Sequence, residues 1–171
     1  MSPNIFIDDF EKTENSDYLH GVLGRSLIIA TRFDSMCTTL SQAMDIKLGA
    51  IFCIHEEGFK DFAQRVISKY RTLNTSIKTF ILPEQIVEIL HKARESRNEI
   101  AHSLTKGLEG CIDMKVDNMT LINEIKRLII NIIYGDIIIS ILTNSFNKDP
   151  IPTIQALENY KNRVLEWVIS P

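Results

Sequence analysis

The fold is decided by one apolar stretch, LIINIIYGDIIISIL, which occupies residues 128–142. A helix that spans a membrane needs about 20 consecutive apolar residues, and this stretch is shorter. Asn131, Gly135 and Asp136 also interrupt it. We therefore expect a helix that is buried inside a bundle of other helices, and no association of the chain with a membrane.

Helical periodicity continues on both sides of this stretch. Apolar residues recur at steps of three and four, which is the pattern of amphipathic helices. The segments with this pattern run approximately over residues 17–46, 59–73, 83–104, 120–145 and 154–168. Residues 77–82 and 111–116 could be extended, but both are too short to form a sheet. The sequence thus predicts an all-α fold, a bundle of about five helices.

The composition is that of an ordinary globular domain. A chain of 171 residues, of which 44% are hydrophobic, can bury one sizeable core. We expect a single domain over residues 1–171, with residues 1–15 as a candidate flexible N-terminal segment. The formal net charge of −3 argues against a protein that coats nucleic acid by bulk electrostatic attraction, although a local basic site remains compatible with it.

The cysteines and the N-terminus indicate a cytoplasmic protein. Cys37, Cys53 and Cys111 are odd in number, lie far apart and have no partner at metal-ligand spacing. We expect reduced thiols, no metal site and no cofactor. Residues 1–9 carry acidic side chains where a signal peptide would have a basic region and then an apolar run.

A second stretch, ARESRNEIAH over residues 93–102, contains the candidate catalytic residues. It places Arg97 and His102 five residues apart on the third predicted helix. A guanidinium is always charged and binds phosphate oxygens through a fork of N–H groups, while an imidazole titrates near neutral pH. Together they can cleave an RNA phosphodiester without a metal ion.

The helical positions of these two residues differ. At about 100° per residue, Arg97 falls on the apolar stripe of its helix, and His102 lies about 140° away from it. A guanidinium in an apolar stripe needs an anion, because an uncompensated buried charge is costly. We predict that Asp136, inside the most apolar helix, is the structural partner of Arg97.

The face that carries His102 is expected to meet a second copy of the chain. This face also contains Val87, His91, Arg94 and Asn98. It has no reason to join the same core, and the small Ala101 beside it would let another helix come close. The prediction is a homodimer in which two copies of Arg97 and His102 line one shared cleft.

The hexapeptide Arg97-Asn98-Glu99-Ile100-Ala101-His102 resembles the R-x4-H signature of the HEPN superfamily, in its common form with a polar residue after the arginine. The resemblance implies a HEPN-like helical bundle that usually dimerises. Many HEPN domains are metal-independent endoribonucleases in toxin, abortive-infection and CRISPR systems. Their arginine and histidine form a composite site at the dimer interface.

The same resemblance implies a role for each matching residue. His102 would act as general acid and base around the ribose 2′-hydroxyl, and Arg97 would hold the scissile phosphate. Asn98 would orient the substrate or His102, and Arg94 and Lys106 are candidate contacts to RNA phosphates. The expected products carry a 2′,3′-cyclic phosphate and a 5′-hydroxyl.

One position departs from a subgroup of the family. Leu104 stands where HEPN toxins that are paired with a nucleotidyltransferase antitoxin carry a tyrosine, so regulation by modification of that tyrosine is not expected. On the last predicted helix, Tyr160 and Trp167 lie at core spacing, and we expect them to pack in the core rather than to stack on bases.

Two classes of function follow from the sequence. The first is a dimeric endoribonuclease that acts on RNA as a toxin or phage-defence effector, with an antitoxin or defence-system partner encoded separately. The second is a catalytically inactive HEPN-like dimerisation, adaptor or regulatory module, in which Arg97 ties two helices together and His102 is a surface residue near a helix end. A third, a small-molecule regulator, would need an internal apolar pocket.

Overall fold

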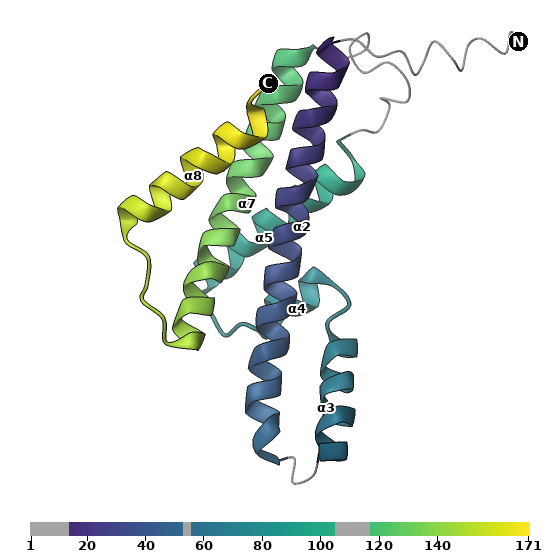
Figure 1. The fold of residues 1–171 in the computed structure, drawn as a ribbon, viewed down its shortest axis with the longest axis vertical. Helices are drawn as coiled ribbons and strands as arrows, with labels where there is room; N and C mark the ends of the chain where they lie inside the picture. Colours follow the sequence, from purple (N-terminus) through teal and green to yellow (C-terminus); the bar gives the residue numbers. More distant parts are fainter. Residues whose placement is uncertain (1–13, 53–55, 105–116) are drawn as a thin grey trace, which may run out of the picture.

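The computed structural model describes residues 14–52, 56–104 and 117–171, and within these ranges the chain is helical without any strand (Figure 1). The elements are α2 (Glu14–Gly49), a 3₁₀-helix (Ala50–Phe52), α3 (Glu56–Lys69), α4 (Leu73–Thr79), α5 (Glu84–His102), α7 (Asn118–Asn147) and α8 (Ile154–Ile169). The predicted all-α class is confirmed for the described residues. Residues 111–116, one of the two candidate extended pieces, lie outside them.

The second predicted helix is divided in two. The apolar pattern continues from α3 into Leu73, but α3 ends at Lys69 and α4 begins at Leu73. Thr72 starts the new helix, because its side chain accepts a hydrogen bond of 3.2 Å from the backbone N–H of Thr75. Residues 77–79 are therefore helical rather than extended, and the predicted extended piece at 77–82 is wrong over its first half.

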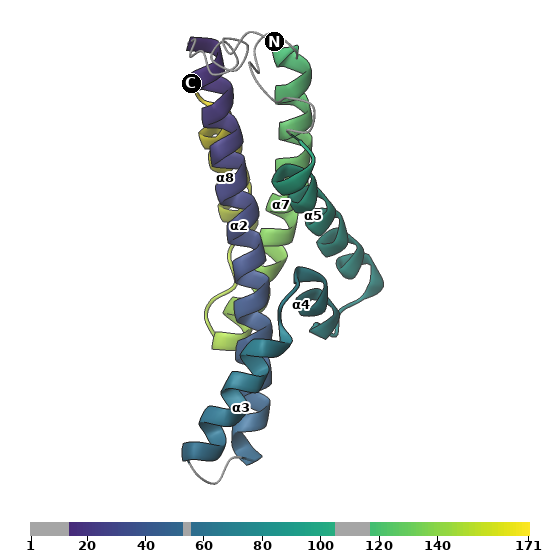
Figure 2. The same ribbon diagram turned by 90° about the vertical axis from the view of Figure 1, so that its right-hand side faces the viewer.

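The two longest helices, α2 and α7, run side by side in the same direction (Figures 1 and 2). At their N-terminal ends Asn118 Nδ2 donates to Asn15 Oδ1 over 2.6 Å, and at their C-terminal ends Lys47 Nζ lies 3.5 Å from the carbonyl oxygen of Phe146. Helix α5 runs in the opposite direction against both. Helix α2 packs against each of the other five α-helices of the described chain.

The apolar stretch of residues 128–142 lies at the centre of α7 and is buried, as predicted. Five of its apolar side chains are 0–1% exposed: Leu128, Ile129, Ile132, Ile133 and Ile139. They pack against the apolar sides of α2 and α5 in one hydrophobic cluster. Among the described helices, none combines the length and the apolar character that crossing a membrane requires.

Gly135 is the point where α2, α5 and α7 come closest together. A Cβ atom on this residue would lie 2.6 Å from Ala93 Cβ of α5 and 2.7 Å from the ring of Phe33 of α2. Both distances are shorter than non-bonded carbon atoms tolerate. The three helices can therefore cross at this distance only because residue 135 has no side chain.

Helix α8 packs against α7 and α2, and its C-terminal end is fastened to α2. Tyr18 Oη donates to the carbonyl oxygen of Ile169 over 3.0 Å, and Arg25 Nε donates to that of Val168 over 3.0 Å. Arg25 also donates to the carbonyl oxygen of Ser170. The cationic side chain thereby satisfies carbonyl groups that a helix leaves unpaired at its C-terminus.

We predict that Gly135→Ala lowers the free energy of unfolding by about 1–3 kcal/mol, because overpacking of a dense core outweighs the gain in helix propensity. The measurement is urea denaturation followed by circular dichroism. Gly24→Ala is the matched control: it also replaces a glycine inside a helix, but its Cβ would have nothing within 4 Å, so it should be neutral or stabilising. Equal effects of the two substitutions would contradict the proposed crossing.

Candidate functional site

Helix α5 carries the candidate catalytic residues. Pro83 precedes its first turn, and Glu84 in that turn suits the positive end of the helix dipole. The helix ends at His102, where the backbone N–H groups of Ser103 and Leu104 both bond to the carbonyl oxygen of Glu99 over 2.9 and 2.8 Å. His102 is thus the last residue of the helix, two residues before the predicted end.

The guanidinium of Arg97 is held on two sides. Its Nη2 atom lies 2.5 Å from Oδ2 of Asp34 on α2, and its Nη1 donates to Oδ1 of the neighbouring Asn98 over 3.1 Å. The side chains of Arg97 and Asp34 are 25% and 26% exposed. Arg97 therefore lies at the edge of the core, in a partly solvated ion pair between α5 and α2.

The predicted pairing of Arg97 with Asp136 is wrong. Asp136 is instead held by Arg32 of α2, whose Nε lies 3.3 Å from its Oδ2, and by Tyr160 of α8, whose hydroxyl donates to the same oxygen. Arg32 and Asp34 are two residues apart on α2, so their side chains leave the helix axis in directions about 200° apart. The two ion pairs consequently lie on opposite sides of α2.

Asp136 is fully buried, with 0% of its surface exposed. Burial raises the pKa of its carboxyl group, while the Tyr160 hydrogen bond and the charge of Arg32 act in the opposite direction. Its Oδ1 atom has no hydrogen-bond partner among the described residues. The same surroundings raise the pKa of the Tyr160 hydroxyl, chiefly by burial and by the hydrogen bond to Asp136. The cluster fastens α8 to α7 and α2.

The other candidate residues on α5 are exposed to different degrees. Asn98 and His102 are exposed, as a substrate-contacting role requires. Arg94 is partly buried, with its Nη2 3.7 Å from Glu95 and its Nε buried without a hydrogen-bond partner in the described chain. His91 Nδ1 is buried and unpartnered in the same sense. Lys106, the second candidate phosphate contact, lies outside the described residues.

The structure brings Arg97, Asn98 and Asp34 into direct contact but does not pair His102 with any of them. His102 lies about 140° around the helix from Arg97. Within one chain, the guanidinium of Arg97 and the imidazole of His102 therefore lie on different sides of α5. A phosphate bound by both groups would have to lie across the C-terminal end of α5, or between two copies of that helix.

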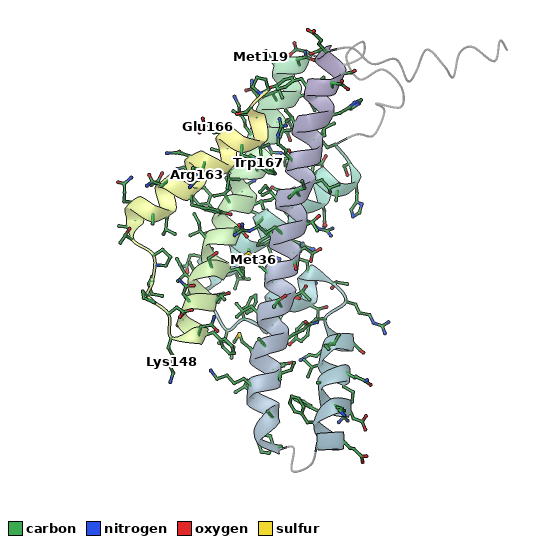
Figure 3. All side chains as sticks on the ribbon, in the orientation of Figure 1. Met36, Met119, Lys148, Arg163, Glu166 and Trp167 are labelled. Carbon is green, nitrogen blue, oxygen red and sulfur yellow. The ribbon has the colours of Figure 1, made fainter. Side chains whose placement is uncertain are left out.

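Sequence reasoning missed Asp34. The residue follows the buried Phe33 on a helix that was correctly predicted, so an acidic side chain at the edge of an apolar stripe was the available signal. It also placed Trp167 wrongly: this side chain is 45% exposed, and it lies with Arg163 and Glu166 on the C-terminal half of α8 (Figure 3). Tyr160 is partly buried, as its core spacing indicated.

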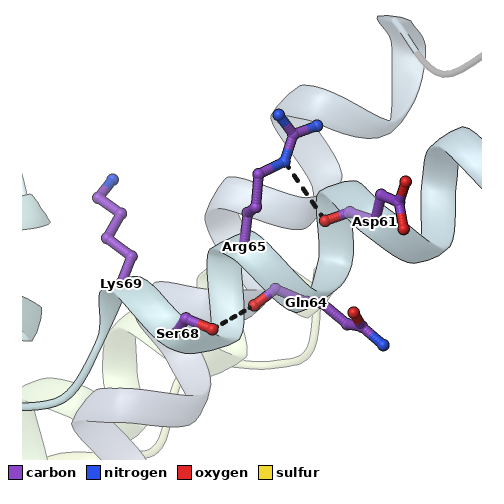
Figure 4. Close-up of a pocket in the computed structure, with 5 residues that line it drawn as sticks. All are labelled: Asp61, Gln64, Arg65, Ser68 and Lys69. Atoms are coloured by element: carbon purple, nitrogen blue, oxygen red, sulfur yellow. Dashed lines mark hydrogen bonds between the residues drawn. The ribbon is translucent and has the colours of Figure 1, made fainter.

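A surface hollow also lies on another helix, α3. This open hollow follows a single face of α3 and is lined by Asp61, Gln64, Arg65, Ser68 and Lys69 (Figure 4). The bonds drawn there join side chains to carbonyl groups one turn earlier in the same helix. Residues 14–52, 56–104 and 117–171 contain no group of three or more His, Cys, Asp or Glu side chains placed to hold a metal ion.

Comparison with protein families, with curated proteins and with solved structures finds no match to the chain. Membership of the HEPN superfamily therefore stays a prediction from the sequence of residues 97–102.

Asp136 should give the stability of the protein a recognisable pH dependence. Because folding raises its pKa, the folded chain binds more protons than the unfolded chain between the ordinary carboxyl value of 3.8 and the raised value. The free energy of unfolding should therefore fall as pH rises through this window. Asp136→Asn cannot titrate, so urea denaturation from pH 4 to pH 8 should show this decline in the wild type relative to the variant. Parallel curves would contradict the assignment.

Proposed function

We propose that this protein is a metal-independent endoribonuclease of the HEPN type, which cleaves RNA as a homodimer and serves as a toxin or phage-defence effector. The observation that carries the proposal is the placement of Arg97, Asn98 and His102. Arg97 is partly exposed and bonded to Asn98, and both Asn98 and His102 are exposed. All three can therefore reach an RNA strand, whereas a purely structural set would be buried.

The chemistry of the proposed reaction follows from the two charged groups. His102 accepts the proton of a ribose 2′-hydroxyl, and the 2′-oxygen attacks the adjacent phosphorus atom. The bond from phosphorus to the 5′-oxygen breaks, and that oxygen receives a proton from the protonated imidazole of His102. Arg97 binds the phosphate and stabilises the charge that develops on its oxygens. The products are a 2′,3′-cyclic phosphate and a 5′-hydroxyl.

Because Arg97 and His102 lie on different sides of α5, a site that is shared between two chains is favoured. Helix α5 exposes Asn98 and His102 on the face opposite to its core contacts. Packing this face against its copy would bring the histidine of one chain towards the arginine of the other. In this arrangement the RNA occupies a cleft between two copies of α5, and a separately encoded antitoxin or defence partner would act by blocking that cleft.

A second candidate function is an inactive HEPN-like adaptor or regulatory module. The ion pair between Arg97 and Asp34 favours it, because it gives Arg97 a structural role in joining α5 to α2. In that case the exposed His102 would be an ordinary surface histidine at the end of a helix. Cleavage assays separate the two functions directly.

We expect the wild type to cleave labelled single-stranded or structured RNA in the presence of EDTA, with 2′,3′-cyclic phosphate ends identified by mass spectrometry. His102→Ala should lower the rate by about 10²- to 10⁴-fold, the usual contribution of a general acid or base. Arg97→Ala and Arg97→Lys should lower it as well, because neither retains the guanidinium fork.

The matched control is His20→Ala, which removes an exposed histidine of α2 and should leave cleavage unchanged. Circular dichroism and sedimentation should show that each variant is folded and dimeric. No cleavage of a broad RNA panel by the folded wild type, or full activity of His102→Ala, would overturn the ribonuclease proposal.

A shared site also predicts complementation between inactive variants. When Arg97→Ala and His102→Ala chains are mixed and allowed to exchange, a mixed dimer retains one Arg97 and one His102 on opposite chains. We expect part of the cleavage activity to return, while a site built within one chain would stay inactive. Each variant incubated alone under the same conditions is the control.

A further inference from the structure

We propose that Asp34 is a positioning residue, which holds the guanidinium of Arg97 in the orientation that binds the scissile phosphate. The inference rests on the proposed ribonuclease function and adds to it a residue from a different helix. Asp34 lies on α2, 63 residues before Arg97, and the R-x4-H pattern does not include it.

Within the described residues, the contacts of Arg97 leave N–H donors available to a phosphate. An arginine side chain has five N–H donors in a rigid, planar fork. Among the described residues, one donor binds Asp34 and one binds Asn98, which leaves three for a ligand. Two contacts on different nitrogen atoms fix both the position and the plane of the group. A bidentate contact to a phosphate depends on that plane, because the two N–H bonds must point along parallel directions.

The negative charge of Asp34 also weakens the electrostatic attraction between Arg97 and RNA. Asp34 lies 2.5 Å from Nη2 of Arg97, so its negative charge offsets much of the positive charge that attracts RNA. Both side chains are only about one quarter exposed, and water therefore screens this effect incompletely. Asp34 should weaken RNA binding and, by orienting Arg97, accelerate cleavage.

These two effects predict that loss of the Asp34 charge raises RNA affinity and lowers turnover, a combination that a merely structural residue would not produce. Removal of the Asp34 charge should tighten RNA binding and make it more salt-dependent, since one more uncompensated cation meets the phosphate backbone. It should also slow turnover, because a small misplacement of a catalytic group costs as much as about 100-fold in rate. A residue that only stabilises the fold would change neither KM nor kcat of the folded molecules.

Asp45 supplies a matched control on the same helix. Its Oδ2 atom accepts from Lys69 and from the Tyr70 hydroxyl, each over 2.7 Å, so it also ties α2 to a neighbouring segment. These partners lie at the C-terminal end of α2, away from α5. Asp45→Asn should therefore change stability without any effect on RNA binding or cleavage.

The experiment compares wild type, Asp34→Asn, Asp34→Glu and Asp45→Asn as full-length dimers, with the folded fraction of each measured by urea denaturation. Affinity is measured by fluorescence anisotropy with a fluorescein-labelled single-stranded RNA that carries 2′-O-methyl groups throughout and cannot be cleaved. Turnover is measured with the RNA that the wild type cleaves. We expect Asp34→Asn to bind several-fold more tightly at low salt and to turn over about 10- to 100-fold more slowly, and Asp34→Glu to recover part of kcat.

Each outcome decides the proposal. If the wild type cleaves RNA and Asp34→Asn has unchanged kcat and affinity, the positioning role is overturned while the ribonuclease function stands. If the wild type binds the methylated RNA without cleaving any substrate, the ribonuclease proposal and the orienting role both fail. An effect of Asp45→Asn as large as that of Asp34→Asn would show that general destabilisation is the cause, and would overturn the inference as well.

Discussion

The close crossing of three helices at Gly135 fixes how α2, α5 and α7 pack against one another. At this residue α7 lies directly against Ala93 of α5 and Phe33 of α2. These two neighbours set the positions of α5 and α2 along α7. Arg97 follows Ala93 by about one helical turn, and Asp34 is the residue next to Phe33. The ion pair between them is therefore a direct result of the packing at the crossing, and the candidate site inherits its geometry from an apolar contact.

The two carboxylates beside this crossing serve different helices. Asp34 binds Arg97 and so joins α2 to α5, while Asp136 binds Arg32 and Tyr160 and joins α7 to α2 and α8. Asp34 is partly solvated, so its partner stays within reach of a ligand. Asp136 is fully buried and its charge is compensated only by its immediate neighbours. Burial alone therefore separates a carboxylate suited to a functional surface from one suited to holding the core.

The architecture could be predicted from the sequence because helical periodicity is a local property. Five predicted segments correspond to α2, α3, α5, α7 and α8, and the buried character of α7 follows from its composition. The short α4 was missed because the apolar pattern continues through the break, and only Thr72 marks its start. The pairing of Arg97 was wrong because it depends on which side of α2 faces α5, and that rotation is set by the contact at Gly135. Periodicity on one helix says nothing about its rotation relative to another.

The fastening of α8 to α2 has a consequence for how the chain acquires its structure. Tyr18 and Arg25 bind carbonyl groups at residues 168–170, so these bonds join positions that are 143 to 151 residues apart in the sequence. Contacts between such distant positions form late and slowly, because a long loop must close first. During synthesis on the ribosome, α2 emerges early, but its contacts with α8 cannot form until residues near 170 have left the exit tunnel. The side of α2 that α8 covers therefore stays exposed until residues 168–170 are available to bind Tyr18 and Arg25.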